Sequence, residues 1–234
     1  MSFFLRTLAL SVLLLAAAEL TAEVYLKGPR IERRPKGQGI PDRSFQDLVE
    51  QKNLMTEKVI CNGVATEVKI SLISGNLAEL LRELKIRYPD LKMDIRRSGV
   101  RFSIPLGKKY QERVLLVGAE GRVTVFTMRL PVPMPSRPEW PSSLPLPPGA
   151  EVDEVIRFSR RGSIYAAFNG AEPGALNRVS STLASYGFMP VTQESATVNG
   201  TGELFMNAGK KQMLLLSIGE DGTGTMYLAP LSKE

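Results

Sequence analysis

Hydrophobic and polar residues follow the same order of patterns in the two halves of the chain. In the first half, a β-branched run at residues 64–74 predicts a strand. Leucines at helical spacing then predict a helix that begins at Asn76, a capping residue with Glu79 three positions later, and that ends before Pro89. The other elements expected in this half are a short helix at 44–54, strands at 91–97 and 99–106, and a hairpin over 107–131.

The second half repeats this order. A hairpin over 152–170 leads to a helix in which Pro173 is tolerated near the first turn and Gly187 is placed to end the helix. Strands are expected at 188–193 and 202–209. The two closing hairpins read alike, "GKKYQERVLLVGAEGRVTVFTMRLP" and "GKKQMLLLSIGEDGTGTMYLAP". We expect their Leu, Val and Met runs to form sheet core, and the repetition to mark a duplicated module.

The segment between the halves, residues 130–149, holds eight of the sixteen prolines. Because proline fixes φ and lacks an N–H group, this segment is expected to be a stiff, largely polyproline-II linker. Trp140 is the candidate linker anchor, packed on a neighbouring domain; the alternative is that the segment is a ligand for an aromatic groove of a partner. The predicted fold class is α+β, with two small tandem modules, each a helix packed on a mainly antiparallel sheet, joined by a proline-rich linker.

The N-terminal residues predict export. One cation, Arg6, precedes an apolar run that ends at Ala18, and small residues follow to Ala22, which is the layout of a secretory signal peptide. Spanning a bilayer takes about 20 apolar residues, so we expect cleavage rather than retention as an anchor. The predicted divisions are a signal peptide at 1–22, a basic extended arm at 23–43, a first α+β module with an N-terminal helix at 44–130, the linker at 131–149 and a second α+β module at 150–234.

Cysteine usage favours the bacterial periplasm as the destination, with secretion as the alternative. Cys61 is the single cysteine, so no intramolecular disulfide can form, whereas small secreted eukaryotic domains depend on disulfides. We expect Cys61 to be a small buried residue at a strand.

The inventory of reactive residues argues against an enzyme. The chain has no histidine, which removes the commonest general base and the commonest metal ligand. The Gly-Lys-Lys sequences at 107–109 and 209–211 lack the spacing and the hydroxyl of a phosphate-binding loop. We therefore predict no catalytic residue, no metal site and no cofactor.

Charge supplies the remaining candidates. Residues 27–43 carry six cations against two acids, and residues 92–113 form a second basic stretch. Such a positive field attracts anionic partners. Few aromatics lie among these cations, so nucleic acid is not the expected ligand. The candidate partner-binding or anion-binding residues are Arg30, Arg33, Arg34, Lys36, Arg96, Arg97, Arg101, Lys108 and Lys109.

These features predict a non-enzymatic exported envelope protein, a periplasmic adaptor or assembly factor for a secretion or pilus-type machine that acts by docking onto other proteins. The alternative is a basic-surface binder of an anionic envelope polymer, a lipid surface or extracellular DNA. The sequence does not set the oligomeric state or the identity of the partner.

Overall fold

The structure of the chain is a computed structural model that describes residues 43–96, 99–119, 121–191, 195–197 and 200–231. The predicted signal peptide at 1–22 and the arm up to residue 42 lie outside the described residues. Among the residues that are described, no helix has the length and apolar character needed to cross a bilayer.

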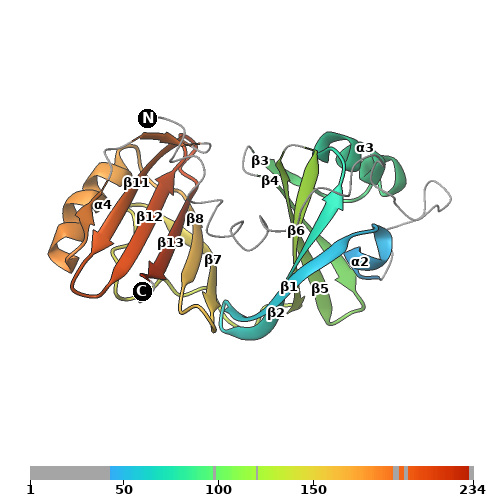
Figure 1. The fold of residues 1–234 in the computed structure, drawn as a ribbon, viewed down its shortest axis with the longest axis horizontal. Coiled ribbons are helices and arrows are strands. Elements are labelled where there is room, and N and C mark those ends of the chain that lie inside the picture. Colours follow the sequence, from blue (N-terminus) through green and yellow to red (C-terminus); the bar gives the residue numbers. More distant parts are fainter. Residues whose placement is uncertain (1–42, 97–98, 120, 192–194, 198–199, 232–234) are drawn as a thin grey trace. The chain divides into compact units, whose positions relative to one another are not determined.

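All described strands belong to one antiparallel sheet (Figure 1). The strand order is β10-β11-β12-β13-β8-β7-β1-β2-β6-β5-β4-β3, and β9 pairs with β11 beside β10. The strands are β1 Lys52–Cys61, β2 Val64–Ser74, β3 Asp94–Arg96, β4 Gly99–Leu106, β5 Tyr110–Ala119, β6 Arg122–Pro131, β7 Glu151–Phe158, β8 Ile164–Asn169, β9 Met189–Pro190, β10 Ser195–Thr197, β11 Gly200–Asn207, β12 Gln212–Ile218 and β13 Gly224–Pro230.

The predicted fold class, two separate helix-on-sheet modules, is therefore wrong. The structure is mostly one large antiparallel sheet with a few short helices. The join is made by β1, whose residues Val59, Ile60 and Cys61 pair with Phe158, Arg157 and Ile156 of β7. This pairing continues the backbone hydrogen bonding from β1 to β7 over three residues of each strand.

The N-terminal helix expected at 44–54 is also corrected. The helix α2 covers only Phe45–Leu48, and β1 begins at Lys52. The strand runs into a tight turn at Asn62 and Gly63, both with positive φ, and returns as β2. Asn-Gly is the residue pair that favours such a two-residue hairpin turn, and the first strand of the hairpin begins inside the last three residues of the expected helix.

Contacts between Cα atoms divide the described chain into two compact units. Unit 1 contains residues 58–65 and 136–231, and unit 2 contains residues 43–57 and 66–135. The tip of the β1–β2 hairpin thus belongs to unit 1 and its base to unit 2.

In unit 2, α2 and α3 (Leu77–Arg87) lie on one face of strands β2, β4, β5 and β6 (Figure 1). As predicted, α3 begins at Asn76, whose side chain accepts a hydrogen bond from the Ala78 N–H at 2.7 Å. The core between helices and strands is formed by buried side chains from both, including Phe45, Leu48, Leu80, Leu84, Phe102, Val114, Leu116, Val123 and Val125.

In unit 1, α4 (Ala175–Leu183) and the short 3-10 helix η1 (Ala184–Tyr186) follow β8, and Gly187 ends them with φ 82°. The core of this unit combines the inward side of α4 with alternate residues of the strands, including Leu176, Val179, Leu183, Val155, Phe168, Phe205, Leu214, Leu216, Met226 and Leu228. Residues 132–150 form neither helix nor strand.

Candidate functional site

Most of the predicted cationic site lies where the structure gives no side-chain positions. Of the predicted residues, those outside the described part or with undescribed side chains are Arg30, Arg33, Arg34, Lys36, Arg96 and Arg97. Their assignment as candidate partner-binding or anion-binding residues stays a prediction.

The three described members of the predicted site do not form one cluster. Arg101 is partly buried in β4, where it lies opposite Asp94 of β3 and Leu115 of β5. Lys108 and Lys109 are exposed in the turn that follows β4. Five residues of strand separate Arg101 from the end of β4, a length of about 17 Å at the usual rise per residue.

Trp140 lies on unit 1. Its ring meets the ring of Phe168 edge to face, with centroids 5.7 Å apart, and its Nε1–H donates to the Leu144 carbonyl at 3.1 Å. Since Phe168 is a buried member of the unit 1 core, Trp140 holds this part of the proline-rich segment against that core.

Unit 1 has a second face that carries apolar side chains. Antiparallel strands place directly opposite residues on the same face, and successive residues on opposite faces. Because Phe205, Leu214 and Leu228 point into the core beside α4, their neighbours in sequence point away from it. We name the residues of this second face the apolar strip; they are Met189, Val191, Leu204, Met206, Met213, Leu215, Tyr227 and Tyr165.

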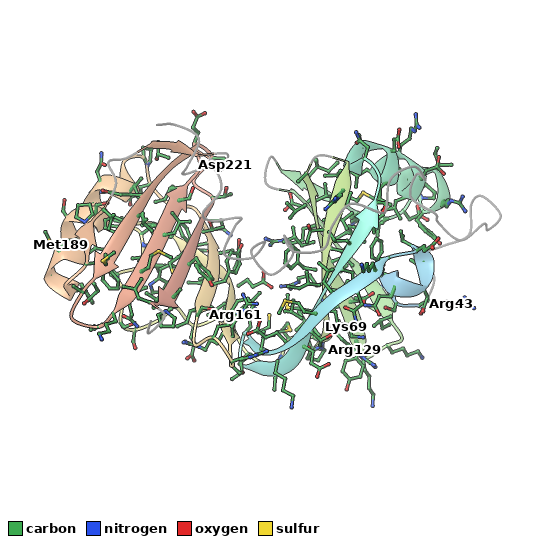
Figure 2. All side chains as sticks on the ribbon, viewed as in Figure 1. Arg43, Lys69, Arg129, Arg161, Met189 and Asp221 are labelled. Atoms are coloured by element: carbon green, nitrogen blue, oxygen red, sulfur yellow. The ribbon has the colours of Figure 1, made fainter. Side chains whose placement is uncertain are left out.

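The strip has two rows that run across the strands. In the first row, Met206 of β11 lies between Met189 of β9 and Met213 of β12. Met189, labelled in Figure 2, is 62% exposed and Met206 is 38% exposed. Three adjacent methionines on an accessible surface are unusual, because flexible thioether side chains ordinarily fill cores or binding surfaces.

In the second row, Leu204, Leu215, Tyr227 and Tyr165 lie opposite one another in successive strands. Val191 extends this row, since its N–H donates to the Leu204 carbonyl at 2.8 Å and its side chain is 51% exposed. The other four are partly exposed. The two rows therefore form a continuous apolar surface with tyrosine hydroxyls at one side.

Charges are separated at the two ends of the unit 1 sheet. The turns at 159–163 and 208–211 adjoin the methionine row and hold four cations and no acid, namely Arg160, Arg161, Lys210 and Lys211. The turns at 170–174 and 219–223, at the opposite end, hold Glu172, Glu220 and Asp221 and no cation. Figure 2 shows Arg161 and Asp221 at these opposite ends.

Buried carboxylates form the remaining polar features. Glu112 of β5 accepts hydrogen bonds from the Phe45 N–H and from the Ser44 hydroxyl, the latter at 3.0 Å. Burial raises the pKa of the Glu112 carboxyl above its usual value, and these two hydrogen bonds act in the opposite direction. The carboxylate thus holds the first residues of α2 on the sheet of unit 2.

Cys61 is buried at the end of β1, as predicted. Its Sγ lies 3.6 Å from Oε1 of the buried Glu154 of β7. Within the described ranges, no group of three or more Cys, Asp or Glu side chains is placed to hold a metal ion.

Comparison with protein-family models finds no matching family, and searches of curated proteins and of solved structures find no match. The function is therefore inferred from the geometry of this chain itself.

The apolar strip was missed by sequence reasoning. The run "MLLL" of the closing hairpin was expected to be sheet core and "GELFMNAG" to be a strand, whereas only alternate residues of β11 and β12 enter the core. A signal was present, because an unbroken apolar strand is typical of burial on both faces and an alternating strand of burial on one.

Proposed function

We propose that this chain is a non-enzymatic exported protein of a bacterial envelope, a periplasmic adaptor or assembly factor for a secretion or pilus-type machine. It acts by docking onto other proteins. The observation that supports docking most directly is the apolar strip on the face of unit 1 opposite α4.

An antiparallel sheet with one covered face ordinarily has polar residues on its other face. Here the other face has methionine, leucine and tyrosine side chains in adjacent strands. Contiguous accessible apolar surface of this kind is typical of protein interaction sites, and tyrosine and methionine are enriched in them.

Photo-cross-linking in the intact envelope tests the proposal. A photoreactive amino acid replaces Met206 in the strip, and in a matched control it replaces Ser181, which is exposed on α4. We expect the chain in the periplasmic fraction and a discrete protein adduct from position 206 that is absent from position 181. A chain confined to the cytoplasm, or identical adduct patterns from both positions, would contradict the proposal.

The alternative is binding of an anionic envelope polymer, lipid or extracellular DNA. One observation favours it: exposed Lys69 and Arg129 lie near each other in unit 2 (Figure 2), with the Arg129 guanidinium 4.3 Å from the centre of the Tyr110 ring. This alternative predicts retention on an anionic polymer with a steep salt dependence that weakens when Lys69 and Arg129 are replaced by glutamine. Retention unchanged by the double substitution would exclude this group as the binding site.

A further inference from the structure

We propose that the apolar strip of unit 1 binds an acidic amphipathic helix of a partner protein. This inference rests on the proposed docking function and names the chemistry of the partner. Three observations support it: the dimensions of the strip, the packing of α4 on the other face of the same strands, and the charges beside the methionine row.

The dimensions of the strip suit one helix. From β9 to β8 it crosses four strand-to-strand spacings, about 19 Å in all, and its two rows lie about 7 Å apart along the strands. The apolar stripe of a helix of three to four turns has a similar length and width. A longer element would extend past the apolar residues.

The opposite face of these strands already packs against a helix, α4. α4 places Leu176, Val179 and Leu183, spaced three and four residues apart, against Leu214 and Leu216 of β12. The intervening residues of β12, Met213 and Leu215, point to the strip. A second helix on the strip would bury β12 on both faces, as its unbroken apolar sequence favours.

Charge selects among the helices that could bind. Lys210 and Lys211 follow the end of β11 by a few residues and therefore adjoin Met206 and Met213. Arg160 and Arg161 occupy the neighbouring turn at the same end of the sheet. A helix lying on the strip has one flank beside these four cations, so glutamate or aspartate on that flank is favoured.

The same charges argue against occupants from this protein. Residues 27–43 of this chain carry six cations against two acids and would be repelled by the four cations. A second copy of the chain carries a net charge of +6 and is disfavoured for the same reason. The charges therefore favour a separate acidic protein as the partner that binds the strip.

The test uses the full exported chain and three synthetic peptides of 16 residues. The first peptide is an amphipathic helix with leucine and methionine on one face and glutamate on the flanks, the second has lysine for each glutamate, and the third has the first peptide's composition in scrambled order. Binding is measured by fluorescence anisotropy at low and at physiological salt. Circular dichroism and the fluorescence of Trp140 verify the fold of each variant.

Two double variants probe the strip, each with a matched control in unit 2. Met189→Ser with Met206→Ser removes apolar contact, and its control is Ile86→Ser with Ile95→Ser, two positions of unit 2 that are 43% and 65% exposed. Lys210→Glu with Lys211→Glu reverses the charge. Its control is Lys52→Glu with Arg82→Glu, which makes the same change of charge at exposed positions of unit 2 outside the predicted site.

We expect the acidic helix to bind at least tenfold more tightly than the lysine peptide and the scrambled peptide. The methionine variant should lose at least tenfold in affinity, and the charge-reversed variant at least fivefold at low salt, with a smaller loss at higher salt. Both controls should stay within twofold of the unmodified chain.

Equal binding of the acidic and lysine peptides, or equal losses in the strip variants and their controls, would overturn the inference. So would a concentration-dependent dimer that the methionine variant abolishes, because the strip would then bind a second copy. If the acidic peptide fails to bind while position 206 still cross-links to a protein in the envelope, the docking function stands and only the partner chemistry is wrong. If the peptide binds but position 206 gives no adduct, the docking function fails instead.

Discussion

The turn that joins β1 and β2 should be the most sensitive polar site in unit 1. The buried side chain of Asn62 accepts a hydrogen bond from the Val155 N–H at 2.7 Å, and the backbone N–H of Asn62 donates to the Val155 carbonyl at 2.9 Å. Its carbonyl also accepts from the Ser136 hydroxyl. Asn62 has φ 48°, in the left-handed region that asparagine and glycine tolerate.

Two substitutions at this position separate the side-chain and backbone contributions. Asn62→Gly keeps the left-handed backbone accessible and leaves the buried Val155 N–H without its acceptor, which costs about 1–3 kcal/mol. Asn62→Ala loses the same acceptor and adds the left-handed strain of a Cβ residue, about 1 kcal/mol more. The expected order of stability is therefore unmodified chain, Asn62→Gly, Asn62→Ala.

Urea unfolding followed by tryptophan fluorescence measures this order. Trp140 is the single tryptophan and packs on Phe168 in the same unit as Asn62, so its signal reports unfolding of unit 1. With the usual urea dependence, a loss of 2 kcal/mol lowers the midpoint by about 1 M. If both variants keep the midpoint of the unmodified chain, the hydrogen bond from the Val155 N–H to Asn62 does not contribute to stability. If both variants have the same lowered midpoint, left-handed strain at position 62 does not contribute.

Three other perturbations test particular contacts. A Cβ at Gly224 would overlap the buried ring of Phe168, so Gly224→Ala should destabilise unit 1 by about 3 kcal/mol in the same urea assay. Its control in the same unit is Gly174→Ala, which has no atom within 4 Å of the added Cβ and should cost about 1 kcal/mol because of its positive φ. Folding raises the pKa of the Glu112 carboxyl above 4.5, so the ionised carboxylate opposes folding. The unmodified chain should therefore gain stability relative to Glu112→Gln as the pH falls from about 7 toward 4.5. A stability difference that is independent of pH would contradict this. Buried Cys61 should not react with an aromatic disulfide reagent until the chain is unfolded, and rapid reaction of the folded chain would refute its burial.

Local sequence signals predicted individual elements well. Residues 64–74 form β2 within the predicted bounds, residues 99–106 form β4, and α3 begins at its predicted cap, Asn76. These elements depend on residues close in sequence: β-branched runs, leucine spacing and a capping side chain.

Long-range pairing was not predictable from the same signals. Asn62-Gly63 is a strong hairpin signal and agrees with the strand predicted at Cys61, but it does not set where that strand begins, and β1 starts at Lys52 inside the helix expected over 44–54. The pairing of Cys61 with Ile156 joins residues that are 95 positions apart. No periodicity within either segment specifies that contact.

The candidate surface escaped prediction for a related reason. The cations that were predicted as a site are visible as composition, but composition does not place Arg101 and Lys108 in space, and the structure separates them along β4. The apolar strip depends instead on which set of alternate residues in β11, β12 and β13 faces α4. That choice is fixed by the pairing register, since a slip of one residue would exchange core and strip.

The edges of the sheet also constrain how a partner can bind. The described strands at the two ends of the sheet are short, since β3 and β10 have three residues each and β9 has two, one of them Pro190, which has no N–H to donate. Short edges and proline disfavour the addition of a strand from another protein. Recognition through side chains on the sheet face is then favoured, and it differs from strand addition because strand addition takes its affinity from main-chain hydrogen bonds. Substitutions at Met189 and Met206 should therefore change which partner binds, whereas the same substitutions would leave a backbone-mediated contact largely intact.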